Sequence, residues 1–120
     1  MKRLAFGIAA TIMFLTVVRA AQKAQTFTGE IMDSQCAAMG THEQMIKTFE
    51  KVSTAKECTL ACVKQGGKFV LFSASTRSTY QLDDQKKPAQ FAGASVTVTG
   101  TLDDSSKTIH LASIKLSRTK

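Results

Sequence analysis

The spacing of hydrophobic positions changes three times along the chain and divides it into four stretches. Residues 4–18 form a nearly continuous apolar run. Residues 26–33 alternate between apolar and polar, which predicts a strand with Phe27 and Ile31 on one face. Residues 41–66 have helical spacing, and a two-residue period then returns to the end of the chain. A helical segment is therefore inserted into what otherwise reads as a small β domain.

Capping signals predict two helices in the insert. Asp33 or Ser34 fits the N-cap of a short turn directly after the first strand. Thr41-His42-Glu43-Gln44 and Thr54-Ala55-Lys56-Glu57 are capping boxes, in which the first and fourth side chains satisfy free N–H groups at a helix start. Gly66-Gly67 predicts the end of the second helix.

Four further strands are predicted after the insert, with a single helical turn at residues 88–92 between the second and third of them. The apolar set of the last strand changes face after Leu111, which predicts a β-bulge near Ala112-Ser113. Gly29 and Gly100 are predicted bend points. The four strands are expected at residues 68–73, 78–82, 95–102 and 107–116.

This pattern predicts a mainly β, α+β protein with two helices between its first and second strands. We expect a small, strongly bent antiparallel sheet of five strands that closes into an OB-like barrel. A two-layer α+β sheet, with the helical segment over one face, is the alternative. Residues 26–117 are expected to form a single domain that carries the helical insert at residues 34–66.

The apolar run at the N-terminus predicts a signal peptide over residues 1–20. Two basic residues precede the run, and Val18-Arg19-Ala20 places small residues at the two cleavage positions. Because the run is shorter than the ~20 apolar residues of a membrane span, we expect cleavage rather than a stable anchor. The protein is thus expected to be exported, periplasmic or secreted, with a flexible tail at residues 21–25.

Charge gives little support to nucleic-acid binding. The leader holds three of the 16 Lys and Arg residues and none of the 9 acids, so the formal net charge falls from +7 to +4 after cleavage. The remaining bases are scattered, and the chain has one Tyr and no Trp. A basic stripe with interleaved aromatic residues is the usual signature of nucleic-acid binding. We therefore expect no nucleic-acid partner.

The three cysteines, Cys36, Cys58 and Cys62, are the main candidates for chemistry. Cys58 and Cys62 are four residues apart on a predicted helix, so their Cβ atoms are expected ~5–6 Å apart. A disulfide needs ~3.5–4.5 Å, and a bond between these two within an intact helix would be strained. Both can instead face a third group, for which Cys36 is the obvious candidate.

Three hypotheses follow for this cluster. A structural disulfide from Cys36 to Cys58 or Cys62 would close a loop of about 25 residues and stabilise the fold by about 3 kcal/mol. One thiol would remain, which also allows a disulfide dimer of an otherwise monomeric chain. The alternative is a zinc or copper site built from Cys36, His42, Cys58 and Cys62, since Cys₃His is an accepted zinc set. Thiol redox chemistry has the least support, because no C-x-x-C is present.

Other candidate residues have simpler explanations. Met39 and Met45 flank His42 at three-residue spacing and would bias a metal site toward copper, but ordinary core packing explains them more simply. The carboxylate pairs Asp83-Asp84 and Asp103-Asp104 lie in predicted turns. His110 is expected on a strand, facing solvent. Since no catalytic motif is present, we expect no enzymatic activity.

Three sequence segments resemble a family of small exported bacterial proteins, largely of uncharacterised function. The family has an OB-like barrel and a D-x2-C … C-x3-C … G pattern. The matching segments are Gly29 to Cys36, Cys58 to Gly67, and Phe91 to Leu102 followed by Ile109 and Ile114. The resemblance implies export, a barrel and a cysteine-centred feature, and no established reaction.

These inferences predict an exported, non-enzymatic binding or structural module. Its disulfide would fix the helical insert to the barrel without a cofactor, and its partner would be a small ligand or an envelope protein. The alternative is a metal-binding protein of the cell envelope.

Overall fold

A computed structural model describes residues 22–39, 47 and 53–117 of the chain. Within these residues the protein is mainly β, with five strands and two α-helices between the first and second strands. The predicted α+β class is therefore confirmed, and so is the helix predicted after Thr54; residues Ser34–Met39, predicted as a short turn, form an α-helix. The helix predicted to begin at Thr41 lies outside the described residues.

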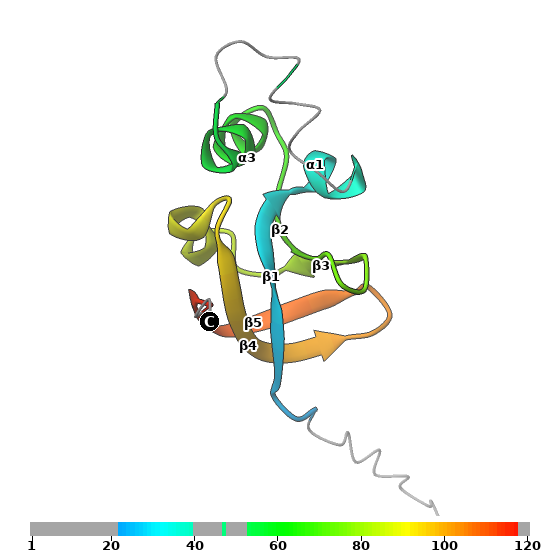
Figure 1. The fold of residues 1–120 in the computed structure, drawn as a ribbon. Helices are drawn as coiled ribbons and strands as arrows, with labels where there is room; N and C mark the ends of the chain where they lie inside the picture. Colours follow the sequence, from blue (N-terminus) through cyan, green and yellow to red (C-terminus); the bar gives the residue numbers. More distant parts are fainter. Residues whose placement is uncertain (1–21, 40–46, 48–52, 118–120) are drawn as a thin grey trace, which may run out of the picture.

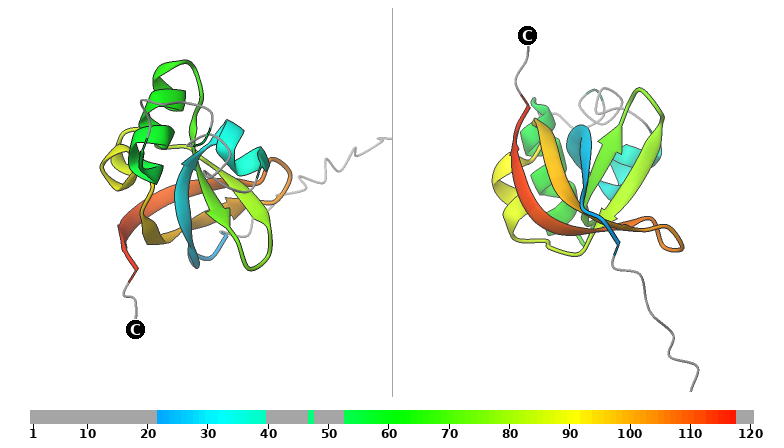
Figure 2. Two further views of the ribbon diagram at one scale, coloured as in Figure 1. Left: turned by 45° about the horizontal axis from the view of Figure 1, so that its top comes forward. Right: turned by 90° about the horizontal axis from the view of Figure 1, so that it is seen from below.

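The five strands close into a ring in the order β1-β2-β3-β5-β4, and β4 pairs back with β1. Figures 1 and 2 show the ring with both helices gathered at one end of it. The strands have the following bounds: β1 Gln25–Asp33, β2 Phe69–Ser73, β3 Ser78–Leu82, β4 Ser95–Asp103 and β5 Thr108–Leu116.

β1 pairs with two different strands along its length. Gln25 to Glu30 pair with β4, and Glu30 to Asp33 pair with β2. A Cβ at Gly29 would lie 2.9 Å from the carbonyl carbon of Phe72, so glycine permits β2 to approach closely at this changeover. The pairing of Gly29 with Val96 is regular, so its role is this close approach and not a bulge.

The predicted bulge in the last strand is confirmed. Thr99 pairs with Ser113 and Gly100 with Leu111, which leaves Ala112 as the extra residue opposite a register shift. The expectation of a wholly antiparallel sheet is wrong, because β3 and β5 run parallel through Gln81 and Leu82. The parallel pairing joins two strands that are far apart in the sequence. The alternation of apolar and polar residues is the same for both strand directions, so it could not predict this pairing.

The core lies inside the ring. Val96 and Val98 point inward from β4 as their spacing predicted, and all four residues of β2 from Phe69 to Phe72 are buried. Val70 and Phe72 pack in a second cluster with Met32 and with Ala37 of the short helix after β1. The central cluster contains Ile31, Phe69, Leu71, Leu82, Ala92, Val96, Val98 and Ile109. A short 3₁₀ helix, η1 (Lys87–Phe91), covers one side of the ring with Pro88 buried.

Candidate metal centre

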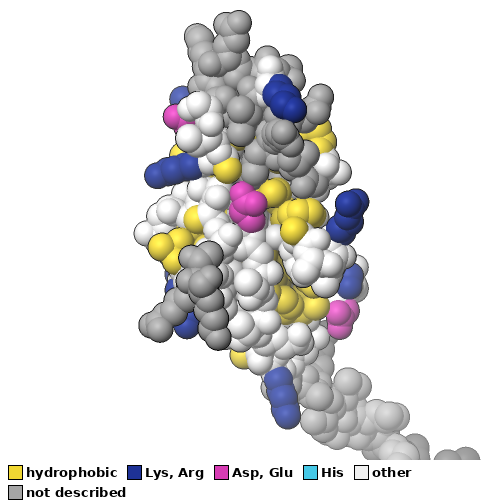
Figure 3. Space-filling model, in the orientation of Figure 1, with side chains coloured by type: hydrophobic (Ala, Val, Ile, Leu, Met, Phe, Trp, Pro, Cys, Tyr) yellow, Lys and Arg dark blue, Asp and Glu magenta, His cyan; other side chains and the backbone are white. Residues whose placement is uncertain are grey.

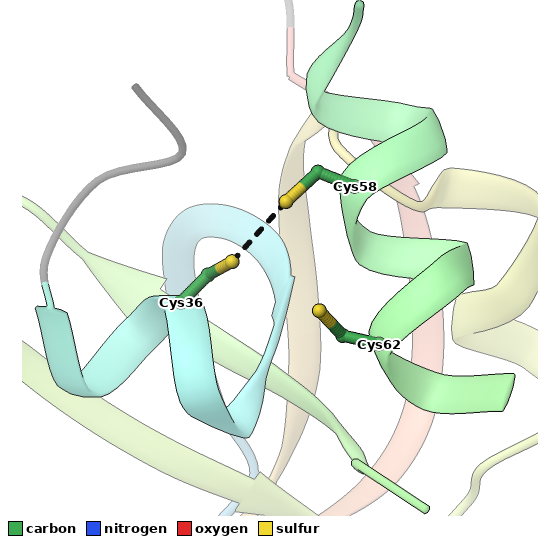
Figure 4. A group of neighbouring side chains, drawn as sticks. All are labelled: Cys36, Cys58 and Cys62. Atoms are coloured by element: carbon green, nitrogen blue, oxygen red, sulfur yellow. Dashed lines mark hydrogen bonds between the residues drawn. The ribbon is translucent and has the colours of Figure 1, made fainter. Parts of the chain in front are cut away.

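The three cysteine side chains of the protein point toward one another from two helices (Figure 4). Cys36 comes from α1 (Ser34–Met39), while Cys58 and Cys62 come from successive turns of α3 (Ala55–Lys64). Their Sγ atoms all lie within 4.8 Å of one another, and Cys36 Sγ is 3.3 Å from Cys58 Sγ. Their exposed fractions are 0%, 1% and 8% in chain order. The structure thus brings together, in a buried site, the three residues that the sequence analysis grouped.

Asp33 positions Cys36. Its carboxylate is fully buried and caps α1, because it accepts hydrogen bonds from the backbone N–H groups of Gln35 at 2.8 Å and Cys36 at 3.3 Å. The N–H of Ser34 donates to the carbonyl oxygen of Lys68 at 2.9 Å, which joins the start of α1 to the start of β2. Cys36 is therefore held at the junction of two paired strands.

The two ends of α3 are also well defined. Thr54 caps its N-terminus by accepting from the N–H of Glu57 at 3.1 Å, and Glu57 in turn accepts from the N–H of Ser53 at 2.8 Å. At the other end Gly66 has a φ of 106°, and the N–H of Gly67 donates to the carbonyl oxygen of Cys62 at 3.0 Å. The predicted bounds of this helix are confirmed.

The surroundings of Cys36 and Cys62 favour the protonated form of both thiols. Burial, helped by hydrogen bonds to Asp33 and Cys58, holds the pKa of Cys36 well above its usual range. Burial, followed by the negative charge of Asp33, also raises the pKa of Cys62. Reactive cysteines are accessible and have lowered pKa values, whereas Cys36 and Cys62 are buried and have raised ones.

The cysteines are free thiols in the structure. The sulfur atoms of Cys36 and Cys58 are 3.3 Å apart, compared with ~2.05 Å in a disulfide. The disulfide therefore stays a prediction. His42, the fourth ligand of the predicted metal set, lies outside the described residues, as does Met45. Met39 is 48% exposed, so core packing does not explain it.

Two buried polar residues beside the cysteines were not anticipated as neighbours of the site. The sequence marks Asp33 as a candidate N-cap and as the first residue of the D-x2-C pattern, but neither signal indicates that its carboxylate is buried beside the thiols. Thr59, next to Cys58 in α3, is fully buried, and its hydroxyl has no hydrogen-bond partner within the described part of the chain. As a polar residue within the predicted helix, Thr59 gives no sequence signal for this burial.

The remaining candidate residues have structural roles. Asp84 accepts from the N–H groups of Lys86 and Lys87, and Asp103 accepts from Ser105, as turn carboxylates commonly do. His110 is exposed on β5, as predicted, and its Nδ1 lies 3.2 Å from a carboxylate oxygen of Asp83. Figure 3 shows Lys and Arg side chains spread singly over one face, without a stripe.

Comparison with known proteins gave no match: no family model fits the sequence, and no curated protein or solved structure is significantly similar to the chain. The family resemblance therefore stays an expectation. Among the helices that the structure describes, none has the length and apolar character needed to cross a membrane.

Proposed function

We propose that the protein is an exported, non-enzymatic module that binds one thiophilic metal ion through Cys36, Cys58 and Cys62. One observation carries the proposal: three buried sulfur atoms, delivered by two separate helices, all lie within 4.8 Å of one another. Thiolates are soft ligands that select ions such as Zn²⁺ and Cu(I). The leader at residues 1–20 supports export.

The spacing of the sulfur atoms suits an ion at their centre. In a tetrahedral site with Zn–S bonds of ~2.3 Å, neighbouring sulfur atoms are about 3.8 Å apart. The sulfur atoms of Cys36 and Cys58 are 3.3 Å apart and no pair exceeds 4.8 Å, so shifts well below 1 Å per side chain would give that spacing. An ion would also offset the electrostatic cost of deprotonating buried thiols next to Asp33.

The scaffold supports an OB-like assignment. Five strands close into a ring in the order β1-β2-β3-β5-β4, and this non-sequential order agrees with a five-stranded Greek-key barrel. The metal-binding helices sit at one end of this ring, between β1 and β2 (Figure 1). In this arrangement the insert forms the site and the ring holds it in place.

The 3.3 Å separation of Cys36 and Cys58 favours one second candidate, a structural disulfide between them. The bond would require the sulfur atoms to approach by about 1.2 Å more and would leave Cys62 as a buried thiol. In that case Cys36→Ser should lower the melting temperature of the oxidised protein, because the cross-link would stabilise the fold by about 3 kcal/mol.

Intact mass measurement separates the two candidates. Protein is purified from the exported fraction with thiols alkylated at lysis, and its mass is recorded under native and denaturing conditions. A native mass heavier by one ion, with three thiols alkylated after unfolding in chelator, supports the metal site. A denatured mass lighter by two hydrogens, with one alkylated cysteine, identifies the disulfide. Three free thiols and no affinity for added metal would exclude both, and a triple Cys→Ser variant controls for adventitious metal.

A further inference from the structure

We infer that the cysteine cluster is built for a soft monovalent ion, Cu(I), held by sulfur ligands alone. This inference rests on the proposed metal-binding function and narrows it to one class of ion. Three features of the site lead to it: the kind of donor atom, the number of donors, and the exclusion of water.

Among the residues that the structure describes, the donor atoms grouped at the site are all sulfur. The chain contains three cysteines in all, so one chain cannot supply the four thiolates of a Cys₄ zinc site or an iron–sulfur cluster. Among the described residues, the group whose ligand atoms lie close enough together to bind one ion contains only Cys36, Cys58 and Cys62. The nearby carboxylate of Asp33 already accepts two backbone N–H groups at the start of α1.

The number of donors and their burial favour a low coordination number. Structural zinc sites have four protein ligands, and catalytic zinc sites complete their coordination with water. Cys36 and Cys58 are at most 1% exposed and Cys62 is 8% exposed, so the cluster has little access to solvent for a water ligand. Cu(I) has a filled d shell and is satisfied by two or three thiolates, so it needs neither a fourth side chain nor water.

The geometry also fits a three-coordinate ion. A planar site with metal–sulfur distances of ~2.3 Å places its three sulfur atoms about 4.0 Å apart. This value lies between the 3.3 Å that separates Cys36 Sγ from Cys58 Sγ and the 4.8 Å that bounds all three pairs. Cys58 and Cys62 supply one edge of the triangle from a single helix, and Cys36 closes it from α1 (Figure 4). Binding replaces thiol protons, which pass to solvent, and copper keeps its oxidation state.

A competition on the wild-type protein tests the choice of ion. Reduced, metal-free protein is loaded with one equivalent of Zn²⁺ and then titrated with Cu(I) supplied as its bathocuproine disulfonate complex. We expect one Cu(I) per chain to be withdrawn from the chelator, with release of the zinc and an affinity for Cu(I) at least ~100-fold higher. Retention of zinc against Cu(I) would overturn the inference but leave the proposed function standing. Failure to bind either ion would overturn both.

Ligand identity is tested separately. X-ray absorption at the copper edge should show sulfur neighbours only, and a nitrogen or oxygen neighbour would overturn the inference. Cys36→Ser should weaken Cu(I) binding ~10-fold or more, whereas His42→Ala should leave it within about 3-fold. A ~10-fold loss in His42→Ala would mean a mixed set of ligands and would contradict the inference. If Cys36→Ser does not fold, the wild-type competition still tests the preference for Cu(I), and the wild-type absorption spectrum still tests whether its ligands are all sulfur.

Discussion

Gly93, in the connection between η1 and β4, lies directly against the backbone of Lys56 in the first turn of α3. A Cβ at residue 93 would meet the Lys56 nitrogen, and it would lie 2.8 Å from Lys56 Cα and 2.7 Å from the carbonyl carbon of Ala55. The N–H of Gly93 also donates to the carbonyl oxygen of Ile31 in β1 at 2.8 Å. One residue thus joins the ring to the helix that carries Cys58 and Cys62.

Gly93→Ala should therefore destabilise the protein strongly. Alanine would have to adopt a φ near 74° and would also collide with backbone atoms that cannot move independently. We expect the free energy of unfolding to fall by about 3 kcal/mol, measured by urea denaturation. Gly66→Ala is the matched control, because Gly66 also has a positive φ but nothing lies within 4 Å of an added Cβ. Its cost should be about 1–2 kcal/mol, and equal costs at the two positions would show that the contact with α3 is unimportant.

Thr59→Val should stabilise the protein. The Thr59 hydroxyl is fully buried, and no hydrogen bond satisfies it within the described residues. Valine has nearly the same shape and removes the desolvation cost, so the free energy of unfolding should rise by about 1 kcal/mol. Thr59→Ser is the control, since it keeps the hydroxyl and loses the methyl group; it should destabilise. A loss of stability in Thr59→Val would mean that the hydroxyl has a partner in the folded protein, such as a buried water.

Gln85→Ala should weaken the attachment of the β3–η1 connection to the ring. The Gln85 side chain accepts from the N–H of Phe69 at 2.8 Å and donates to the carbonyl oxygens of Phe69 and Leu82 at 2.9 and 3.0 Å. Losing all three bonds should cost about 2 kcal/mol in thermal or urea unfolding. Gln81→Ala, on the exposed side of β3, should cost less than about 0.5 kcal/mol. Similar costs for the two variants would argue against a role for these bonds.

Local sequence signals predicted much of this fold. Capping residues gave both ends of α3, and the change of apolar face along the last strand gave the bulge at Ala112. Each of these features is determined by residues that are close together in the chain, so it can be predicted from the sequence alone. The parallel pairing of β3 with β5 depends on how distant strands meet, and alternation of side chains is the same for both strand directions.

The candidate site was predictable to a similar extent. Helical spacing placed Cys58 and Cys62 on one face, and their strained geometry for mutual bonding pointed to Cys36 as a third member. Burial of Asp33 beside the thiols was not predictable, because the capping role and the proximity to Cys62 arise from different elements. The separation of 3.3 Å between Cys36 and Cys58 likewise comes from how α1 and α3 pack, which no local pattern encodes.

The link between Asp83 and β5 should make stability depend on acidic pH. The Asp83 carboxylate accepts from the N–H of Leu111 at 2.8 Å and contacts His110, and these bonds lower its pKa, the one to Leu111 most. Because its pKa is lower in the folded state than the ~3.9 of an unfolded chain, the stabilisation is present above that value and is lost as the pH falls through the folded pKa. The carboxylate is partly exposed, so its contribution is about 1 kcal/mol or less. Asp83→Asn should therefore be less stable than wild type at pH 7, and this difference should shrink by pH 2 in urea unfolding. Asp104→Asn, in the exposed β4–β5 turn, is the matched control, and an equal pH-dependent loss there would contradict the assignment to Asp83.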